Sequence, residues 1–250
     1  MTSLSDFVQL LGYLFLFGAI LVLVYYLLPA QAPGEAPRAA PAPRKGGTKP
    51  HRAIDMADLI AQSDAHERYV PGHAGRVARL ASALAGAAGL PAELRARIHQ
   101  AGLLHDIGMM EVPAELLARS SVLPQADMGP IWRHPVRGAA KALELTKDPE
   151  LAGWVRASHE RWDGLGYPDG LAGEEIPLPA RILRIADSAE AMLQDRPYRP
   201  ALIPDEVSAE LIRFSGVMYD PHLVPLFVDY VLPHYLLQEV SSSVRSDLPS

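Results

Sequence analysis

The chain contains no cysteine among its 250 residues. This absence excludes disulfide bonds, zinc sites built from thiolates and iron–sulfur clusters. An excess of positive charge is also lacking, because 23 basic residues face 29 acidic residues and give a net charge of −6. The composition therefore does not predict binding to duplex nucleic acid, and a small anionic ligand would need local basic residues.

Two structural patterns are missing as well: convincing period-two strands and internal repeats of solenoid length. The period that is present is helical, with apolar residues three and four positions apart, as in Val77, Leu80 and Leu84. Proline and glycine interrupt this pattern at intervals. The sequence therefore predicts an all-α domain, with later helices over residues 125–145, 149–160, 178–193, 205–215 and 221–238.

A long apolar run occupies residues 7–28, and its 22 positions carry no charge. A helix of this length spans roughly the 30 Å hydrocarbon core of a bilayer, so we expect one transmembrane anchor in contact with lipid. A cleaved signal peptide is the alternative, because Ala30-Gln31-Ala32 has the small-x-small form of a cleavage site. The length of the run and the absence of a basic residue before it favour the anchor.

Charges on the two sides of the run predict its orientation. Only Asp6 precedes it, whereas five basic residues follow it: Arg38, Arg44, Lys45, Lys49 and Arg52. The positive-inside rule therefore places the remainder of the chain in the cytoplasm, as a single-pass protein of the inner membrane. Residues 29–52 are rich in proline, alanine and basic residues and read as a linker. We expect a folded domain over residues 53–240 and a flexible tail over 241–250.

Polar residues interrupt the apolar helix faces where a core is expected. His73 lies four residues before Val77, and Asp187 lies inside an otherwise apolar helical stretch. One such histidine alone would be read as a hydrogen-bonded core residue. The set, however, comes one per predicted helix, about 25 to 32 residues apart: His73, His105-Asp106, His134, His159 and Asp187. Helices packed around one centre could bring them together, and imidazoles mixed with carboxylates suit first-row divalent metals.

Several ordered motifs resemble the HD-GYP branch of the HD superfamily of metal-dependent phosphohydrolases. The string His105-Asp106-Ile107-Gly108 resembles the HD motif, and the stretch from His159 to Pro168, HERWDGLGYP, resembles the HD-GYP signature. The other similar blocks are His134-Pro135 with Gly138, Ile185-Ala186-Asp187, and Asp195-Arg196-Pro197-Tyr198-Arg199. The likeness runs from about Tyr69 to Phe227, in the family's order and spacing.

The resemblance implies a helical HD bundle around a metal site and hydrolysis of cyclic di-GMP, to the linear dinucleotide or GMP. It implies two divalent ions, iron or manganese, with Asp106 bridging them, and a catalytic role for His105 and Asp106 in holding a metal-bound hydroxide. The implied metal ligands are His73, His105, Asp106, His134, His159 and Asp187. The implied substrate-binding residues are Gly166, Tyr167, Pro168, Arg196 and Arg199.

Two positions depart from the family pattern. Met109 stands where the family carries a lysine, and Ser158 stands where it carries a second histidine. A hydroxyl is a poor replacement for an imidazole as a ligand to first-row metals, so we expect weakened activity and lower occupancy of one metal site. Two alternatives therefore stay open: a degenerate domain that binds the nucleotide or a partner protein without hydrolysis, and a phosphohydrolase for another phosphate ester. A homodimer or a signalling partner is equally compatible with the sequence.

Overall fold

Helices make up most of the part of the protein that the structure describes, and the sequence prediction of an all-α domain is confirmed. The computed structural model describes residues 56–67, 71–117, 127–195 and 200–237. Within these ranges the structure has no strand, only two isolated bridges between residues 163 and 172 and between 215 and 219. All of these residues belong to one unit, residues 51–250.

The first helices in chain order are α2 (Met56–Glu67), α3 (His73–Ala87), α4 (Ala92–Leu104), the 3-10 helix η1 (Ile107–Glu111), α5 (Ala114–Leu117) and α6 (Gly129–Trp132). They are followed by α7 (His134–Thr146), α8 (Pro149–Arg156), the 3-10 helix η3 (Gly173–Glu175), α9 (Leu178–Leu193) and α10 (Pro204–Arg213). The last elements are α11 (Leu223–Leu226) and a π-helical segment, η4 (Phe227–Val231). Helical structure continues from η4 to residue 237.

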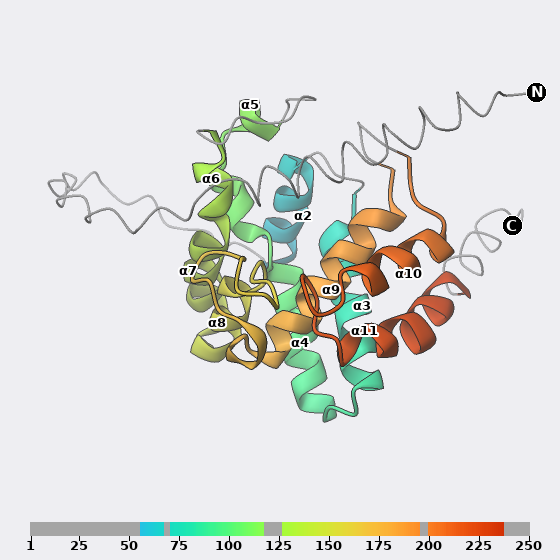
Figure 1. Ribbon diagram of the computed structural model, residues 1–250. Helices are drawn as coiled ribbons and strands as arrows, with labels where there is room; N and C mark the ends of the chain where they lie inside the picture. The colour runs from blue at the N-terminus through green and yellow to red at the C-terminus, as the bar shows by residue number, and fades with distance from the viewer. Residues whose placement is uncertain (1–55, 68–70, 118–126, 196–199, 238–250) are drawn as a thin grey trace, which may run out of the picture. The chain divides into compact units, whose positions relative to one another are not determined.

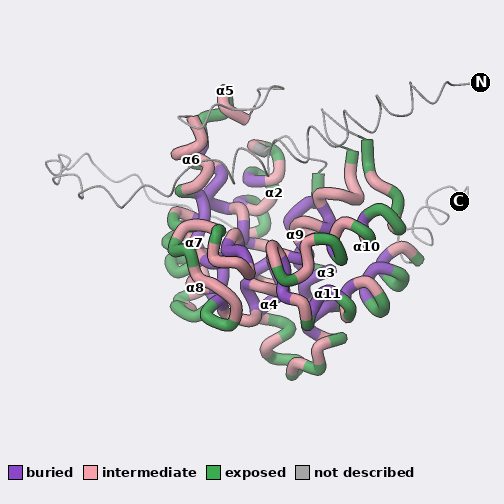
Figure 2. The backbone as a smooth tube through the Cα atoms, viewed as in Figure 1, coloured by how far each residue is buried: buried purple, intermediate pink, exposed green. Residues whose placement is uncertain are grey.

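Helix α3 lies at the centre of the bundle and packs against both α4 and α9. Figure 1 shows these three helices between α7 and α8 on one side and α10 and α11 on the other. The largest fully buried side chains come from all parts of this arrangement and include Leu80, Leu84, Ile98, Leu151, Ile182, Leu211 and Phe227. Figure 2 shows the buried positions gathered on the inner faces of the helices.

Two of the predicted helices end differently in the structure. The expected helix over 125–145 is broken at Arg133 into α6 and α7, because Pro135 lacks a backbone N–H and fits only the first turn of a new helix. The expected helix over 149–160 ends at Arg156. The backbone N–H of Ala157 donates to the carbonyl of Gly153, and that of Ser158 donates to the carbonyl of Val155, so α8 closes before His159.

The predicted anchor (7–28), linker (29–52) and tail (241–250), and the expected domain boundaries at 53 and 240, lie outside the described residues. Among the residues that the structure does describe, no helix is both long and apolar enough to cross a membrane.

Candidate metal centre

The six predicted ligands come together at one place, and most of them lie at helix ends. His73 is the first residue of α3 and His134 the first of α7, while His105 and Asp106 follow the last residue of α4. The expectation that His159 lies on a helix is therefore wrong, because this residue lies in the turn after α8. Asp187, inside α9, fits that expectation.

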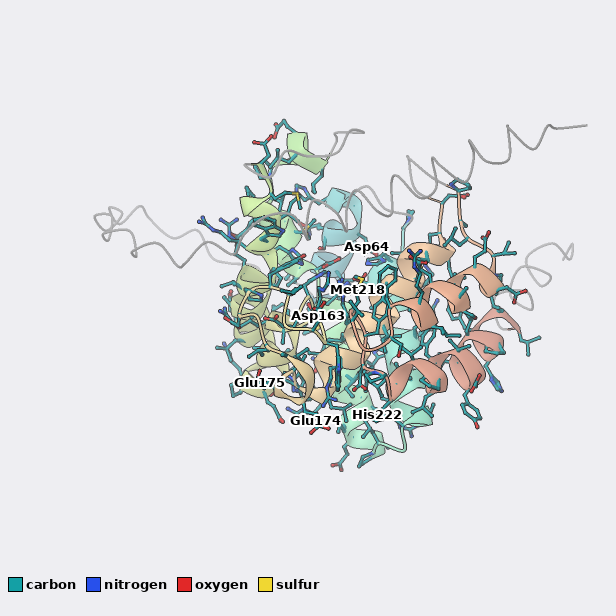
Figure 3. All side chains as sticks on the ribbon, in the orientation of Figure 1. Asp64, Asp163, Glu174, Glu175, Met218 and His222 are labelled. Atoms are coloured by element: carbon teal, nitrogen blue, oxygen red, sulfur yellow. The ribbon has the colours of Figure 1, made fainter. Side chains whose placement is uncertain are left out.

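The start of α3 is held in place from α2. Asp64 accepts hydrogen bonds from the backbone N–H groups of Gly72 (3.0 Å) and Ala74 (3.2 Å), on either side of His73. Figure 3 labels Asp64 above α3. Gly72 has a φ of 87°, a left-handed conformation that favours glycine. This turn fixes the direction in which the His73 ring enters the site.

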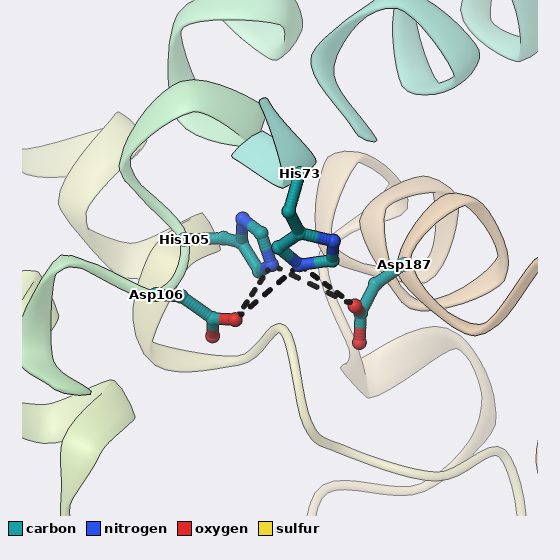
Figure 4. A group of neighbouring side chains, drawn as sticks. All are labelled: His73, His105, Asp106 and Asp187. Carbon is teal, nitrogen blue, oxygen red and sulfur yellow. Dashed lines mark ion pairs between the residues drawn. The ribbon is translucent and has the colours of Figure 1, made fainter. Parts of the chain in front are cut away.

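The first group of donor atoms consists of His73, His105, Asp106 and Asp187, whose ligand atoms all lie within 4.8 Å of one another. Nε2 of His105 lies 3.1 Å from Oδ2 of Asp106 and 3.7 Å from Oδ1 of Asp187. Nε2 of His73 lies 3.6 Å from each of the same two oxygens. Figure 4 shows the two imidazoles facing the two carboxylates, an arrangement that suits one cation.

The second group consists of Asp106, His134 and His159. The other carboxylate oxygen of Asp106, Oδ1, lies 3.2 Å from Nε2 of His134 and 3.7 Å from Nε2 of His159. Asp106 therefore offers one oxygen to each group, the arrangement that a bridging ligand requires. Among the described residues this group has three donors, one fewer than the first.

The buried ring nitrogens provide a test of whether these residues fit a metal. Nε2 of His105, His134 and His159 is buried without a hydrogen-bond partner among the described residues. Buried polar atoms are normally paired, so three unpaired nitrogens aimed at carboxylates need an explanation. A first-row divalent metal accepts this mixture of imidazole and carboxylate donors, and the residues present fit such an ion.

Glu190 is a functional residue that sequence reasoning missed. Its Oε2 accepts a hydrogen bond from Nδ1 of His73 at 2.5 Å, and its Oε1 accepts one from Nε of Arg76 at 2.6 Å. Glu190 is buried and lies three residues after Asp187 on α9. The available signal was a second acidic residue three positions after Asp187, and so on the same side of α9. Such partners fix the ring and tautomer of a ligating histidine.

Burial and neighbouring charges set the protonation of the site. Burial lowers the pKa of His73, but the carboxylates of Asp106 and Glu190 more than offset this and raise it to about 9. Burial raises the pKa of Asp187, whereas His105 outweighs burial and holds that pKa well below its usual range. Burial lowers the pKa of His159 to about 4. Without a cation His73 is protonated at neutral pH, so a metal that binds through its Nε2 must displace a proton.

Gly108 explains why the HD motif ends in glycine. A Cβ at this position would lie 2.0 Å from the carbonyl oxygen of His134 and 2.6 Å from the backbone nitrogen of Gly138. The backbone of η1 therefore packs directly on the first turn of α7. This close approach brings Asp106, just before η1, next to His134.

The GYP segment folds back over the second group. The ring of Tyr167 stacks on His159, with the ring planes 6° apart and the centroids 5.2 Å apart. A Cβ on Gly166 would lie 2.3 Å from the backbone nitrogen of Arg161, so this loop also depends on a close backbone contact. Pro168 follows in the same loop. The substrate-binding roles of these residues stay predictions, and Arg196 and Arg199 lie outside the described residues.

The two departures from the family pattern are both buried. The hydroxyl of Ser158 donates a hydrogen bond to the carbonyl of Val155 at 2.9 Å. Ser158 is buried, but its hydroxyl binds the carbonyl at the end of α8. Met109 is buried in η1 and adds no charge to the site.

The chain is similar to known proteins that share this domain. A family model described as HD domain matches residues 56–223. The chain belongs to the HD domain family. Its similarity to the HD-GYP branch is confirmed by its relatives: it is 36% identical over 155 residues to a 3′3′-cGAMP-specific phosphodiesterase 1 of Vibrio cholerae, and 37% identical over 151 residues to the cyclic di-GMP phosphodiesterase response regulator RpfG of Xanthomonas campestris.

The matches cover 62% and 60% of this chain but only 35% and 40% of those two relatives, so the chain matches less than half the length of either. A solved structure of a cyclic GMP-AMP specific phosphodiesterase of V. cholerae has the same fold, with a TM-score of 0.57 and 21% identity. That similarity covers 78% of this chain and 54% of the other.

Proposed function

We propose that this HD domain is a metal-dependent phosphodiesterase that hydrolyses a cyclic dinucleotide, with cyclic di-GMP as the substrate. The observation that carries the proposal is the position of Asp106, whose two oxygens face two groups of imidazoles. The names of its relatives, which describe cyclic dinucleotide phosphodiesterases, support the substrate class. Iron or manganese is the proposed metal, as the mixed nitrogen and oxygen donors favour.

Bound divalent ions at such a site lower the pKa of a coordinated water toward ~7 and stabilise charge on phosphoryl oxygens. The side chains of this chain prepare the site for that chemistry. Asp106 and Asp187 hold negative charge between the imidazoles, because both carboxylates have depressed pKa values. The hydrogen bonds from Nδ1 of His105 to the Gly102 carbonyl and of His134 to the Ile131 carbonyl leave the Nε2 lone pairs pointing inward.

A second candidate function is binding of the nucleotide, or of a partner protein, without hydrolysis. Ser158 and Met109 favour it, because neither supplies the ligand or the charge found at the family positions. Six ionisable side chains, three of them buried and three half-buried, are kept in one place and favour hydrolysis, since a scaffold gains nothing from them.

We further propose that residues 7–28 anchor the chain in the inner membrane, with the HD domain in the cytoplasm. The five basic residues after the apolar run support this orientation. A reporter that is active only after export, fused after Val240, should stay silent. A strong signal from the exported reporter would favour the signal peptide. The HD domain would then lie outside the cytoplasm, without access to a cytoplasmic messenger.

The enzymatic proposal is tested with the full chain purified in detergent. Elemental analysis should find bound transition metal, and added cyclic di-GMP should be converted to linear dinucleotide or GMP. Asp106→Ala should lose both metal and turnover, whereas Asp58→Ala, which changes an exposed carboxylate on α2, should lose neither. Binding of intact cyclic di-GMP without turnover in excess manganese would favour the binding domain instead.

A further inference from the structure

The hydrogen bonds of the four histidine rings are not alike. His73, His105 and His134 each direct Nδ1 at an oxygen acceptor: Oε2 of Glu190 (2.5 Å), the carbonyl of Gly102 (2.8 Å) and the carbonyl of Ile131 (2.7 Å). These acceptors require a proton on Nδ1. Each neutral ring therefore keeps its lone pair on Nε2, the nitrogen that faces the carboxylates.

His159 has the opposite environment. Its Nδ1 lies 3.2 Å from Nη1 of Arg184, and a guanidinium group can only donate hydrogen bonds. Nδ1 of His159 is therefore the acceptor, and the proton of the neutral ring sits on Nε2. That is the nitrogen that lies 3.7 Å from Oδ1 of Asp106. A ring nitrogen that carries a proton has no lone pair for a metal.

Arg184 also brings positive charge to this side of the centre. It lies on α9 three residues before Asp187, and thus on the same side of the helix. Within the described part of the chain it forms no ion pair, and its Nε has no hydrogen-bond partner. Glu160 and Arg184 both line a small cavity of about 10 Å³. Oε1 of Glu160 accepts hydrogen bonds from the backbone N–H groups of Asp169 and Gly170, and its buried Oε2 has no hydrogen-bond partner among the described residues. A guanidinium one imidazole ring away from a cation site disfavours a second cation there.

We propose that Arg184 sets the number of metal ions at this centre, by holding His159 in the tautomer that cannot bind a metal through Nε2. The inference rests on the proposed metal-dependent function and deepens it. The four-donor group of His73, His105, Asp106 and Asp187 binds one ion tightly. The three-donor group binds a metal weakly because Arg184 keeps His159 in the wrong tautomer and Ser158 supplies no replacement ligand. Arg184 is thus a positioning residue, which acts through His159.

The first test reads the tautomer directly in the metal-free full chain. Nitrogen-15 NMR of the imidazole side chains should assign the proton of His159 to Nε2, and that of His134 to Nδ1. In Arg184→Gln the amide oxygen can accept a hydrogen bond, so His159 should shift its proton to Nδ1. A proton on Nδ1 of His159 in the unchanged protein would overturn the proposal.

The second test counts metal ions by titration with Mn²⁺, followed by calorimetry and electron paramagnetic resonance of the bound manganese. The unchanged protein should bind one ion tightly and give a mononuclear signal. Arg184→Gln should bind a second ion at least about tenfold more tightly than the unchanged protein does and give the signal of a coupled pair. Arg184→Lys, which keeps a donor and a charge, should behave like the unchanged protein, and so should Arg133→Gln, which removes an exposed charge.

The outcomes separate this inference from the proposed function. Two ions of similar affinity in the unchanged protein would overturn the role of Arg184 and leave the phosphodiesterase proposal standing. An unaltered second-site affinity in folded Arg184→Gln would do the same. Absence of manganese binding in every protein would overturn both.

Discussion

Glu190→Gln tests how far a residue that contacts only the far nitrogen of a ligating histidine controls metal affinity. The substitution keeps the size of the side chain but removes its charge, so Nδ1 of His73 and Nε of Arg76 lose a shared carboxylate. Glu190 is only 1% exposed, and water cannot replace the lost contact. The His73 ring then loses both its fixed orientation and part of its basicity.

Changes of this kind in other metalloproteins lower metal affinity by about 10–100-fold, which corresponds to about 1.4–2.7 kcal/mol. We expect the upper part of this range, because the hydrogen bond to His73 is short and joins two buried groups. The assay is calorimetric titration of the metal-free full chain with Mn²⁺. Thermal unfolding in excess chelator measures separately any loss of stability that comes from leaving Arg76 without its partner.

Glu174→Gln is the matched control, since Glu174 is exposed on η3 and labelled at the surface in Figure 3. It should change neither affinity nor stability. Glu190→Asp keeps the charge at a greater distance and should fall between the two. A folded Glu190→Gln protein whose manganese affinity lies within about twofold of the original would refute the reasoning.

Three further predictions concern the same centre. Gly108→Ala should destabilise the domain by about 3 kcal/mol in chemical denaturation, or lower metal retention in elemental analysis, because the new Cβ meets the His134 carbonyl. Gly153→Ala is the control: its Cβ meets nothing within 4 Å, so it should be neutral or stabilising. Apparent metal affinity should rise by at least about tenfold per pH unit from pH 6.5 toward 9, because the pKa of His73 is raised to about 9 and that of His105 is raised as well, so protons compete with the metal. A flat profile in calorimetry would contradict this. Ser158→His should increase retention of a second ion by at least about tenfold in elemental analysis, and unchanged retention would show that this buried position does not face a metal.

The same raised pKa has a consequence for stability without metal. The folded pKa of His73, about 9, lies above the ordinary value of 6.5, so protonation of this ring favours the folded state. That contribution is fully present below about pH 6.5 and is lost as the pH rises through 9. The contribution of His73 should therefore make metal-free, chelator-treated protein unfold at a lower temperature at pH 9 than at pH 6.5.

Much of the helical architecture follows from the sequence because helical periodicity reports burial. The stretch 178–193 was predicted with the bounds that α9 has, and its apolar stripe is fully buried at Ile182 and Ile185. The breaks were harder to predict. Pro135 identifies the start of α7 only when it is known to lie in the first turn of a helix. The end of α8 at Arg156 depends on the loop that follows it.

The candidate ligands could be predicted from the sequence because most of them are polar residues where apolar ones are expected. Their partners were not found, for a physical reason. Glu190 and His73 are 117 residues apart, and Arg184 and His159 are 25 apart, so no local pattern joins either pair. A helix face can be derived from spacing along the chain, but the direction of a hydrogen bond across the site cannot. The tautomer of His159 follows only from the side chain that contacts it.

The position of the ligands at the ends of separate helices links the metal to the folding of the whole domain. The donors of the first group come from α3, from the turn after α4 and from α9, so no fragment of the domain can assemble the site. An ion that binds only the folded chain, present at 100 times its dissociation constant, adds about 2.7 kcal/mol to the free energy of unfolding. Metal supply would then govern how much of this protein survives proteolysis in a cell as well as how fast each molecule works.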